Sequence, residues 1–293
     1  MISRKTLKTT LLITTILSFG ASLTATAQAD SIDKALAKQS DKAKARYQYR
    51  NPKQTLEFFG IKEGMTVVEA LPGGGWYTKI LLPILGEDGK LVGVDYPQEM
   101  WSNFNFMTPE RIEEKKTWVD TWTEKASSWR EEGDASVAAF KFSAMPDAMQ
   151  GSADAVLFIR ALHNLTRFND KGNYLESALK DTHAVLKDGG VVGVVQHQAR
   201  EDRPDSWADG NNGYLKQSFI VAKFESHGFE LIGESDVNAN PKDQANEGDI
   251  VWRLPPSLSG SKDDETKKAA MLAIGESNRM TLLFKKVGSK EEK

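Results

Sequence analysis

The stretch VVEALPGGGWYT, residues 67–78, decides how the rest of this chain is interpreted. Its apolar start predicts a buried strand over 65–70, and its glycines predict a tight turn before a helix over 76–85. Glycine adopts positive φ without steric cost, and its missing Cβ lets a ligand lie against the backbone. The start of the helix would direct free N–H groups and a positive dipole end toward that ligand. The stretch therefore predicts a nucleotide-type site, and a plain turn between a strand and a helix is the alternative.

An acid also closes the next apolar segment. Residues 90–95 are predicted to form a strand that ends at Asp95. Strand, helix and strand in this order form a right-handed parallel unit. Asp95 stands ~20 residues beyond the glycines, where a carboxylate accepts both ribose hydroxyls of an adenosine. Asp95 alone is equally consistent with an ordinary acid at a strand end, and the preceding glycines favour ribose binding.

The remaining pattern predicts a single α/β domain. Further strands are expected over 135–142, 153–159, 191–195, 229–235 and 280–284, and helices over 53–59, 108–132, 173–186 and 214–226. Trp118, Trp122 and Trp129 are spaced for one helix face and are expected to pack in the core. Ligands of open α/β sheets bind beyond the carboxyl ends of the strands. The polar residues that follow 153–159 and 191–195 should therefore face the same crevice as the glycines.

The first thirty residues differ from the rest of the chain. Three cations within the first eight residues precede an apolar stretch over 11–19, and Ala27-Gln28-Ala29 is a small-residue cleavage site. The apolar stretch is short for a membrane span. We therefore expect a signal peptide over 1–29, a mature protein that begins at Asp30 and is periplasmic, and no stable membrane insertion after cleavage.

The composition narrows the function further. The chain of 293 residues has a formal net charge of −3, which becomes −6 once the three cations of residues 1–29 are removed. An acidic balance argues against general nucleic-acid binding. The sequence has no cysteine, which excludes disulfides, thiolate metal sites, a cysteine nucleophile and lipid attachment to an N-terminal cysteine.

The mature chain divides into three segments on composition. Residues 30–50 predict a helical arm, 51–288 the α/β domain, and 289–293 a charged tail. Within the domain, residues 236–276 form a long segment rich in Pro, Asp, Asn and Lys. A loop of this length is usually functional or mobile, so we expect either a lid over the substrate or a mobile insertion.

Taken together, these motifs resemble those of the class I methyltransferases that use S-adenosylmethionine. The stretches that match motifs of that superfamily are 67–75, 95–100, 154–156 with 162–164, and 186–190. More narrowly, 58–61, 64–69 and 72–78 resemble a family of predicted exported methyltransferases, and the similarity covers nearly all of the mature chain. The resemblance implies a Rossmann-like, doubly wound sheet of seven strands, mostly parallel with an antiparallel last strand.

One position departs from the superfamily pattern. Leu71 and Pro72 stand where the usual Gly-x-Gly-x-Gly begins, and only Gly73 and Gly75 align with its later glycines. Proline restricts the residue before it, so Leu71 is expected to be extended.

The resemblance also implies a cofactor, S-adenosylmethionine, and residues to hold it. By position, Glu69, Gly73 and Gly75 would hold its amino-acid portion and Asp95 its ribose. The other residues carried over are Tyr96 and Met100 for the adenine faces, Ser143 or Ala144 for the adenine edge, and Arg160 for the carboxylate.

The sequence is less specific about the residues that would bind the methyl acceptor. His163 and His197 have the pKa that a general base needs, and Asn164, with Gln196 and Gln198, could orient a polar acceptor. Each of these side chains has a purely structural alternative. No metal is expected, because carboxylates are missing where some small-molecule methyltransferases hold magnesium. The acceptor itself, a small molecule or an envelope component, is not identified by the sequence.

Two other functions remain open at this stage. A nicotinamide-dependent oxidoreductase shares the strand, helix and ribose acid, but Thr78 stands where its third glycine is expected. The second alternative is a binding or interaction protein that has the same fold and catalyses no reaction. S-adenosylmethionine is made in the cytoplasm, and nothing in this sequence explains how an exported enzyme would be supplied with it.

Overall fold

A computed structural model describes residues 30–288 of the protein. The predicted signal peptide and the charged tail over 289–293 lie outside the described residues. Within 30–288, no helix has the length and apolar character needed to cross a membrane.

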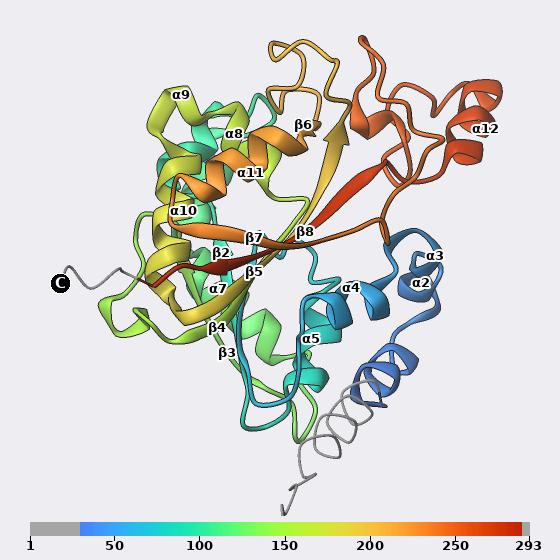
Figure 1. Ribbon diagram of the computed structural model, residues 1–293. Coiled ribbons are helices and arrows are strands. Elements are labelled where there is room, and N and C mark those ends of the chain that lie inside the picture. The colour runs from blue at the N-terminus through green and yellow to red at the C-terminus, as the bar shows by residue number, and fades with distance from the viewer. Residues whose placement is uncertain (1–29, 289–293) are drawn as a thin grey trace, which may run out of the picture.

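A single mixed sheet organises the described chain (Figure 1). Its main strands are β1 (Thr66–Ala70), β2 (Lys90–Asp95), β3 (Ser136–Lys141), β4 (Ala153–Ile159), β5 (Leu186–Ala199), β7 (Phe229–Ser235) and β8 (Arg279–Lys286). Their order is β3-β2-β1-β4-β5-β8-β7, with β8 antiparallel to both β5 and β7. A two-residue strand, β6 (Leu215–Lys216), pairs with the end of β5. The predicted fold class, a doubly wound and mostly parallel sheet with an antiparallel last strand, is confirmed.

Helices cover both faces of the sheet, which explains why its central strands are apolar runs without alternation. On the face of Val68, the covering helices are α8 (Leu162–Arg167), α10 (Tyr174–Val185) and α11 (Gln217–Glu225). On the face of Val67, the cover includes α4 (Pro52–Phe58) and α5 (Thr78–Leu85). Figure 1 shows α10 and α11 on one side of the sheet and α4 and α5 on the other. Neighbouring residues of one strand therefore belong to two separate cores.

The helix predicted over 108–132 is broken in the structure. It consists of α6 (Pro109–Glu114), a 3-10 turn η2 (Lys115–Thr117) and α7 (Trp118–Ser127). Trp122 is buried, and its ring lies 2.6 Å from the position that a Cβ on Gly93 would occupy. The prediction that Trp122 packs in the core is confirmed, because the glycine in β2 leaves room for the indole.

The arm predicted over 30–50 consists of short helices packed on the domain. Residues 30–37 are helical, followed by α2 (Asp41–Lys44) and α3 (Tyr47–Arg50). Ile32 and Leu36 are buried in the same core as α4 and α5. The Tyr47 hydroxyl donates to the Leu36 carbonyl at 3.0 Å. The arm is therefore part of the hydrophobic core.

The long segment over 236–276 lies at the end of the sheet to which β5 points (Figure 1). It contains a 3-10 turn, η4 (Val251–Arg253), and a helix that the sequence did not predict, α12 (Glu265–Ile274). The other elements that sequence patterns missed are short: η1 (Gln98–Asn103), η3 (Asp147–Met149), α8 and α9 (Asn169–Gly172).

Candidate functional site

The turn after β1 brings the chain to the edge of the sheet where the parallel strands end. The Leu71 amide donates to the Val94 carbonyl at 2.7 Å, and Leu71 has φ 55°. The expectation that Pro72 keeps Leu71 extended is therefore wrong. The sharp turn needs a left-handed residue at the position of the missing first glycine, and leucine adopts that geometry at a cost of ~1–2 kcal/mol.

The glycines of the turn have different surroundings. Gly73 has φ 54°, and a Cβ there would meet only the Leu71 carbonyl oxygen at 3.9 Å; around Gly74 the space is open. Gly75 has φ 76°, and the ring of Trp129 lies 2.2 Å from its Cβ position. The backbone of Gly73 and Gly74 is thus open to a ligand, whereas the space beside Gly75 is filled by the protein itself.

Glu69 lies beneath this turn. Its side chain is buried and accepts a hydrogen bond from the Thr78 hydroxyl at 2.6 Å. Burial raises the pKa of Glu69 to about 7, and the hydrogen bond from Thr78 opposes that rise. Glu69 can therefore gain or lose a proton near neutral pH, or become fully ionised beside a bound cation.

Asp95 ends β2 at the position predicted for the ribose acid. It is 5 % exposed, and the Lys115 ammonium lies 3.2 Å from its carboxylate. The same ammonium lies 3.8 Å from the centre of the Trp101 ring. Burial raises the pKa of Asp95, and Lys115 opposes that rise. The break between α6 and α7 thus supplies a cation to this carboxylate.

The residues carried over for the adenine lie partly in the core. Met100 is fully buried, and the buried Tyr96 accepts a hydrogen bond from the Asn164 amide at 3.0 Å. Ser143 and Ala144 are exposed after β3, and the Ser143 amide donates to Asp181 at 2.6 Å. Asn164 therefore positions Tyr96, and the adenine roles of these residues stay predictions.

A cavity of about 410 Å³ opens at the carboxyl ends of β1, β4 and β5. Its lining includes Gly73 from the turn, Arg160 and His163 after β4, His197 from β5 and Trp252 from the long segment. The rings of His163 and His197 lie 5.6 Å apart. As the sequence predicted, these histidines share a crevice with the glycine turn.

Gln196 and Gln198, the other candidates for orienting an acceptor, are used within the fold. The Gln196 amide donates to the Gly213 carbonyl at 2.9 Å, and the Gln198 amide donates to Gln217 at 3.2 Å. Neither glutamine is among the residues that line the cavity. Within 30–288, no cluster of three or more His, Asp and Glu side chains is arranged to hold a metal ion.

Both histidines are held in the neutral form. Burial lowers the pKa of His163 to about 4, and the nearby Arg160 lowers it further. Burial also lowers the pKa of His197 well below its usual value, with further contributions from His163 and Arg160. Nδ1 of His197 lies 2.6 Å from the Ser277 hydroxyl. Neutral imidazoles can accept a proton, but burial makes both groups weaker bases than a histidine of ordinary pKa.

Four arginines surround one buried carboxylate beside this cavity. Glu276 receives hydrogen bonds from Arg46 at 2.8 Å, Arg50 at 3.3 Å and Arg279 at 3.4 Å, and Arg160 lies 4.0 Å away. Burial disfavours ionisation of Glu276, but Arg50, Arg279 and Arg46 outweigh it and lower its pKa. Sequence reasoning missed this cluster except for Arg160, because Arg46 and Glu276 are 230 positions apart and no local pattern links them.

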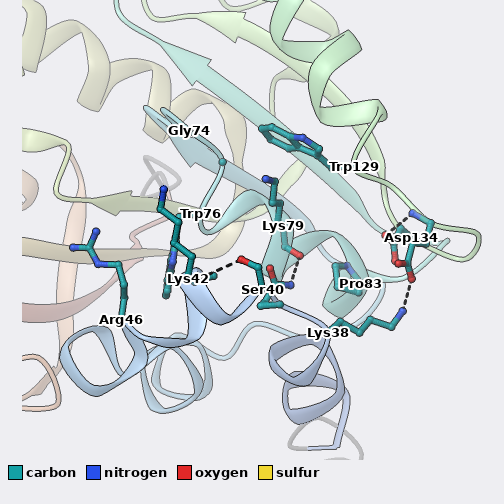
Figure 2. Close-up of a pocket in the computed structure, with 14 residues that line it drawn as sticks. Lys38, Ser40, Lys42, Arg46, Gly74, Trp76, Lys79, Pro83, Trp129 and Asp134 are labelled. Carbon is teal, nitrogen blue, oxygen red and sulfur yellow. Dashed lines mark hydrogen bonds and ion pairs between the residues drawn. The ribbon is translucent and has the colours of Figure 1, made fainter. Parts of the chain in front are cut away.

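A second cavity, of about 570 Å³, lies between the arm and α5. Figure 2 shows Lys38, Ser40 and Lys42 of the arm facing Lys79 and Trp129. Arg46, Gly74 and Trp76 line both cavities, so they form the boundary between them.

Comparison with known proteins supports the fold assignment. No family profile and no curated protein matched the chain. Among solved structures, one chain of the complex between the Haloferax volcanii Trm112 methyltransferase activator and the protein described as a methyltransferase has a TM-score of 0.51 and 16 % identity, over 90 % of this chain and 99 % of that one.

Two further structures resemble the chain with lower scores. The S-adenosylmethionine-dependent methyltransferase from Aquifex aeolicus has a TM-score of 0.45 and 16 % identity, over 87 % of this chain and 98 % of its own. The [4+2]-cyclase SpnF has a TM-score of 0.47 and 15 % identity, over 82 % of this chain and 81 % of its own. Strand order, the antiparallel β8 and the first of these three similarities show that the chain has the Rossmann-like fold of class I methyltransferases.

Proposed function

We propose that this protein is an S-adenosylmethionine-dependent methyltransferase whose acceptor binds in the cavity at the carboxyl ends of β4 and β5. One observation carries the proposal. The open glycine turn after β1 and the buried Asp95 at the end of β2 lie side by side, because Ala70 and Val94 are paired in parallel register. A backbone turn beside a ribose-binding acid is the arrangement that recognises an adenosine cofactor.

The chain's residues fit the two halves of this cofactor differently. On the amino-acid side, Gly73 and Gly74 leave free space, and Glu69 could ionise beside an ammonium group. On the ribose side, Lys115 already contacts Asp95, so the ribose hydroxyls would share that carboxylate with Lys115 or displace it. When bound, the cofactor would supply an electrophilic methyl group activated by its sulfonium.

The chain's own contribution to transfer would be positioning and proton removal. His197 donates from Nδ1 to the Ser277 hydroxyl in the tautomer that leaves Nε2 free to accept a proton from the acceptor. His163, whose ring lies beside that of His197, is the second candidate base. Trp252 and Pro255 of the long segment line the same cavity and would limit access of water to it.

Calorimetric titration of the mature protein with S-adenosylmethionine, S-adenosylhomocysteine and NAD tests the proposal. We expect the first two to bind and Asp95→Ala to weaken them at least ~tenfold, because a charge-assisted hydrogen-bonding group is lost. Asp154→Ala is the matched control: this acid contacts Thr66 and Lys187 at the amino ends of the strands, away from the cofactor. Preferential NAD binding, or no binding of any of the three, would overturn the proposal.

Binding and turnover require separate measurements. A protein that binds the cofactor but transfers no labelled methyl group to any fraction of a cell extract would be a binding protein with the same fold. His197→Gln and His163→Gln variants should slow transfer without weakening cofactor affinity if these imidazoles act as bases on the acceptor.

We also propose that the protein acts in the periplasm, on a small molecule or an envelope component. The support is the sequence of residues 1–29, with its cationic start, apolar stretch and small-residue cleavage site. Expression of the full chain in a Gram-negative host, followed by fractionation and N-terminal sequencing, should yield a periplasmic protein that begins at Asp30. A full-length protein in the cytoplasm would contradict this assignment.

A further inference from the structure

The arginine cluster around Glu276 has more positive charges than negative ones. Three arginines, Arg46, Arg50 and Arg160, line the cavity, and within residues 30–288 Glu276 is the only acid among its lining residues. Charged groups are rarely buried without a partner, because desolvation without compensation is costly. The cavity wall is therefore short of negative charge.

The arginines differ in how far their donors are satisfied. Arg46 donates to Glu276 through two nitrogens. Arg279 does not line the cavity, and each of its three nitrogens donates a hydrogen bond, to the Ser277 carbonyl, to Glu276 and to the Tyr49 carbonyl. The hydrogen bonds of both arginines join the N-terminal arm to the region where β8 begins.

Arg160 is different. Its Nε is buried and has no hydrogen-bond partner among the described residues, and its nearest acid is Glu276, 4.0 Å away. It follows β4 directly and has φ 61°, a geometry that costs a non-glycine residue free energy and is typical of functional positions. Arg50, stacked 4.6 Å from the centre of the Trp76 ring, bonds Glu276 through Nε alone. Arg160 and Arg50 thus have N–H donors that make no hydrogen bond within residues 30–288.

The cofactor of the proposed reaction does not supply the missing charge. S-adenosylmethionine has a carboxylate, an ammonium and a sulfonium, so it brings a net positive charge into the cavity. Burial, followed by the proximity of Arg279, lowers the pKa of Arg160 to about 10, which leaves its guanidinium charged at neutral pH. The cavity would therefore keep an excess of positive charge with this cofactor bound, and a second, anionic ligand would offset it.

The cavity also has an apolar part. Trp252, Leu254, Pro255 and Pro256 of the long segment line the same space, of about 410 Å³, as the arginines. A space of this size suits a small molecule. The two neutral histidines line the same cavity, and the ring of His163 lies 5.9 Å from that of Trp252.

We propose that the acceptor is a small anionic molecule, a carboxylate or a phosphate ester on an apolar body, whose anionic group binds Arg160 and Arg50 while its hydroxyl or amine reaches the histidines. This inference rests on the proposed methyl transfer for the word acceptor, but the anion site itself does not.

Calorimetry of the mature protein with three matched aromatic probes tests the site. We expect 4-hydroxybenzoate and phenyl phosphate to bind at least ~tenfold more tightly than neutral 4-hydroxybenzamide, because the arginines form charge-assisted hydrogen bonds with the anions. A stronger response to one of the two anions would distinguish a carboxylate acceptor from a phosphate ester. Equal binding of all three probes would overturn the proposal.

Variants locate the site. Arg160→Gln should weaken anion binding at least ~tenfold, whereas Arg160→Lys should retain part of it. Arg200→Gln, which removes an exposed arginine paired with Asp202, is the matched control and should change nothing. Arg160→Gln is expected to fold, because Arg160 donates no side-chain hydrogen bond within 30–288. Unchanged anion affinity in a folded Arg160→Gln would overturn the assignment.

A second titration separates this inference from the proposed function. The anions should bind equally well in the presence of saturating S-adenosylhomocysteine, because the site serves a second ligand. Competition between the two would show that the arginines serve only the cofactor's carboxylate, and would overturn the inference. Anion binding without any S-adenosylhomocysteine binding would instead refute the proposed methyl transfer and leave the anion site standing.

Discussion

Leu71 shows how one residue can keep a turn whose usual glycine is missing. It has a left-handed φ, donates its amide to β2 and packs part of its side chain against the core. This geometry places a cost of ~1–2 kcal/mol on a leucine at the edge of the proposed cofactor site.

At this position glycine should be better than alanine. Leu71→Gly is expected to be more stable than Leu71→Ala by ~1 kcal/mol, because only glycine adopts positive φ without strain. Urea unfolding measures the difference. The exposed helical residue Leu272 in α12 provides the control pair, where alanine should be the more stable by a similar amount. The same order at both positions would contradict a strained Leu71.

Glu69 should make stability depend on pH. Its pKa is raised to about 7 in the folded protein, so the folded state binds more protons than the unfolded state between pH ~4.5 and 7. Stability from this group therefore falls as pH rises through that window. Relative to the natural protein, Glu69→Gln should gain ~2–3 kcal/mol between those limits, because one pKa unit corresponds to ~1.4 kcal/mol. Parallel stability curves of the two proteins, measured by chemical unfolding, would contradict the shift.

The residues of the site fall into two groups: those whose neighbours in the site are close in sequence, and those whose partners are distant in sequence. Glu69, Gly73 and Asp95 are near one another in sequence, so strand and turn patterns predicted their positions at or just after the ends of β1 and β2; their roles in cofactor binding stay predictions. The partners of Arg160 and His197 come from Glu276 and Ser277, which a sequence pattern does not connect to them.

At the scale of elements, the long segment over 236–276 is anchored by one buried ion cluster. Arg253 donates to Asp243, Asp249 and the Tyr214 hydroxyl, each at 2.9 Å. Asp243 also accepts from the Asn278 amide at 3.0 Å, which ties the segment to the start of β8. These bonds tie the segment to the rest of the domain, and its role as a lid stays a prediction.

Breaking this anchor should loosen the segment before the rest of the domain. Arg253→Met is expected to destabilise the protein by ~3 kcal/mol, because it leaves Asp243 buried without its cation. Limited proteolysis should then cut within 236–276 first. Arg200→Met removes an exposed arginine and should cost less than ~1 kcal/mol. Equal proteolysis of both variants would show that the cluster does not hold the segment.

The break between α6 and α7 also belongs to this scale. Sequence periodicity predicted one helix, and its α7 part packs against β2 and β3. The 3-10 turn at Lys115–Thr117 redirects the chain so that Lys115 meets Asp95 while Trp122 meets Gly93. Tertiary packing on two sides of the sheet edge outweighs the local preference for a continuous helix.

At the scale of the whole molecule, the arm joins the fold from outside the sheet. It covers α5 with apolar side chains and supplies Arg46 and Arg50 to Glu276. The two cavities meet at this arm, so its position sets the shape of both.

The arm should therefore contribute to global stability. Leu36→Ala is expected to lower the free energy of unfolding by ~2–4 kcal/mol, because it removes a buried side chain. Lys42→Ala, at an exposed position of the same arm, should stay within ~0.5 kcal/mol. Chemical unfolding of the mature protein measures both. Equal stability of the two variants would show that the arm is only a linker.

By itself the sequence determined the main strands of the sheet, although β5 is longer than the predicted 191–195 and β6 lies within a predicted helix. The strands over 90–95, 153–159 and 229–235 have the predicted bounds, and the glycine turn and Asp95 lie where their spacing placed them. Apolar runs and turn residues are local signals, and parallel crossover units join in few ways. Only the tertiary structure decided three sets of contacts. Lys115 pairs with Asp95, the ring of Trp129 fills the space beside Gly75, and the arginines surround Glu276. Charge pairing and close packing join residues distant in sequence, and such contacts leave no periodic signature in the chain.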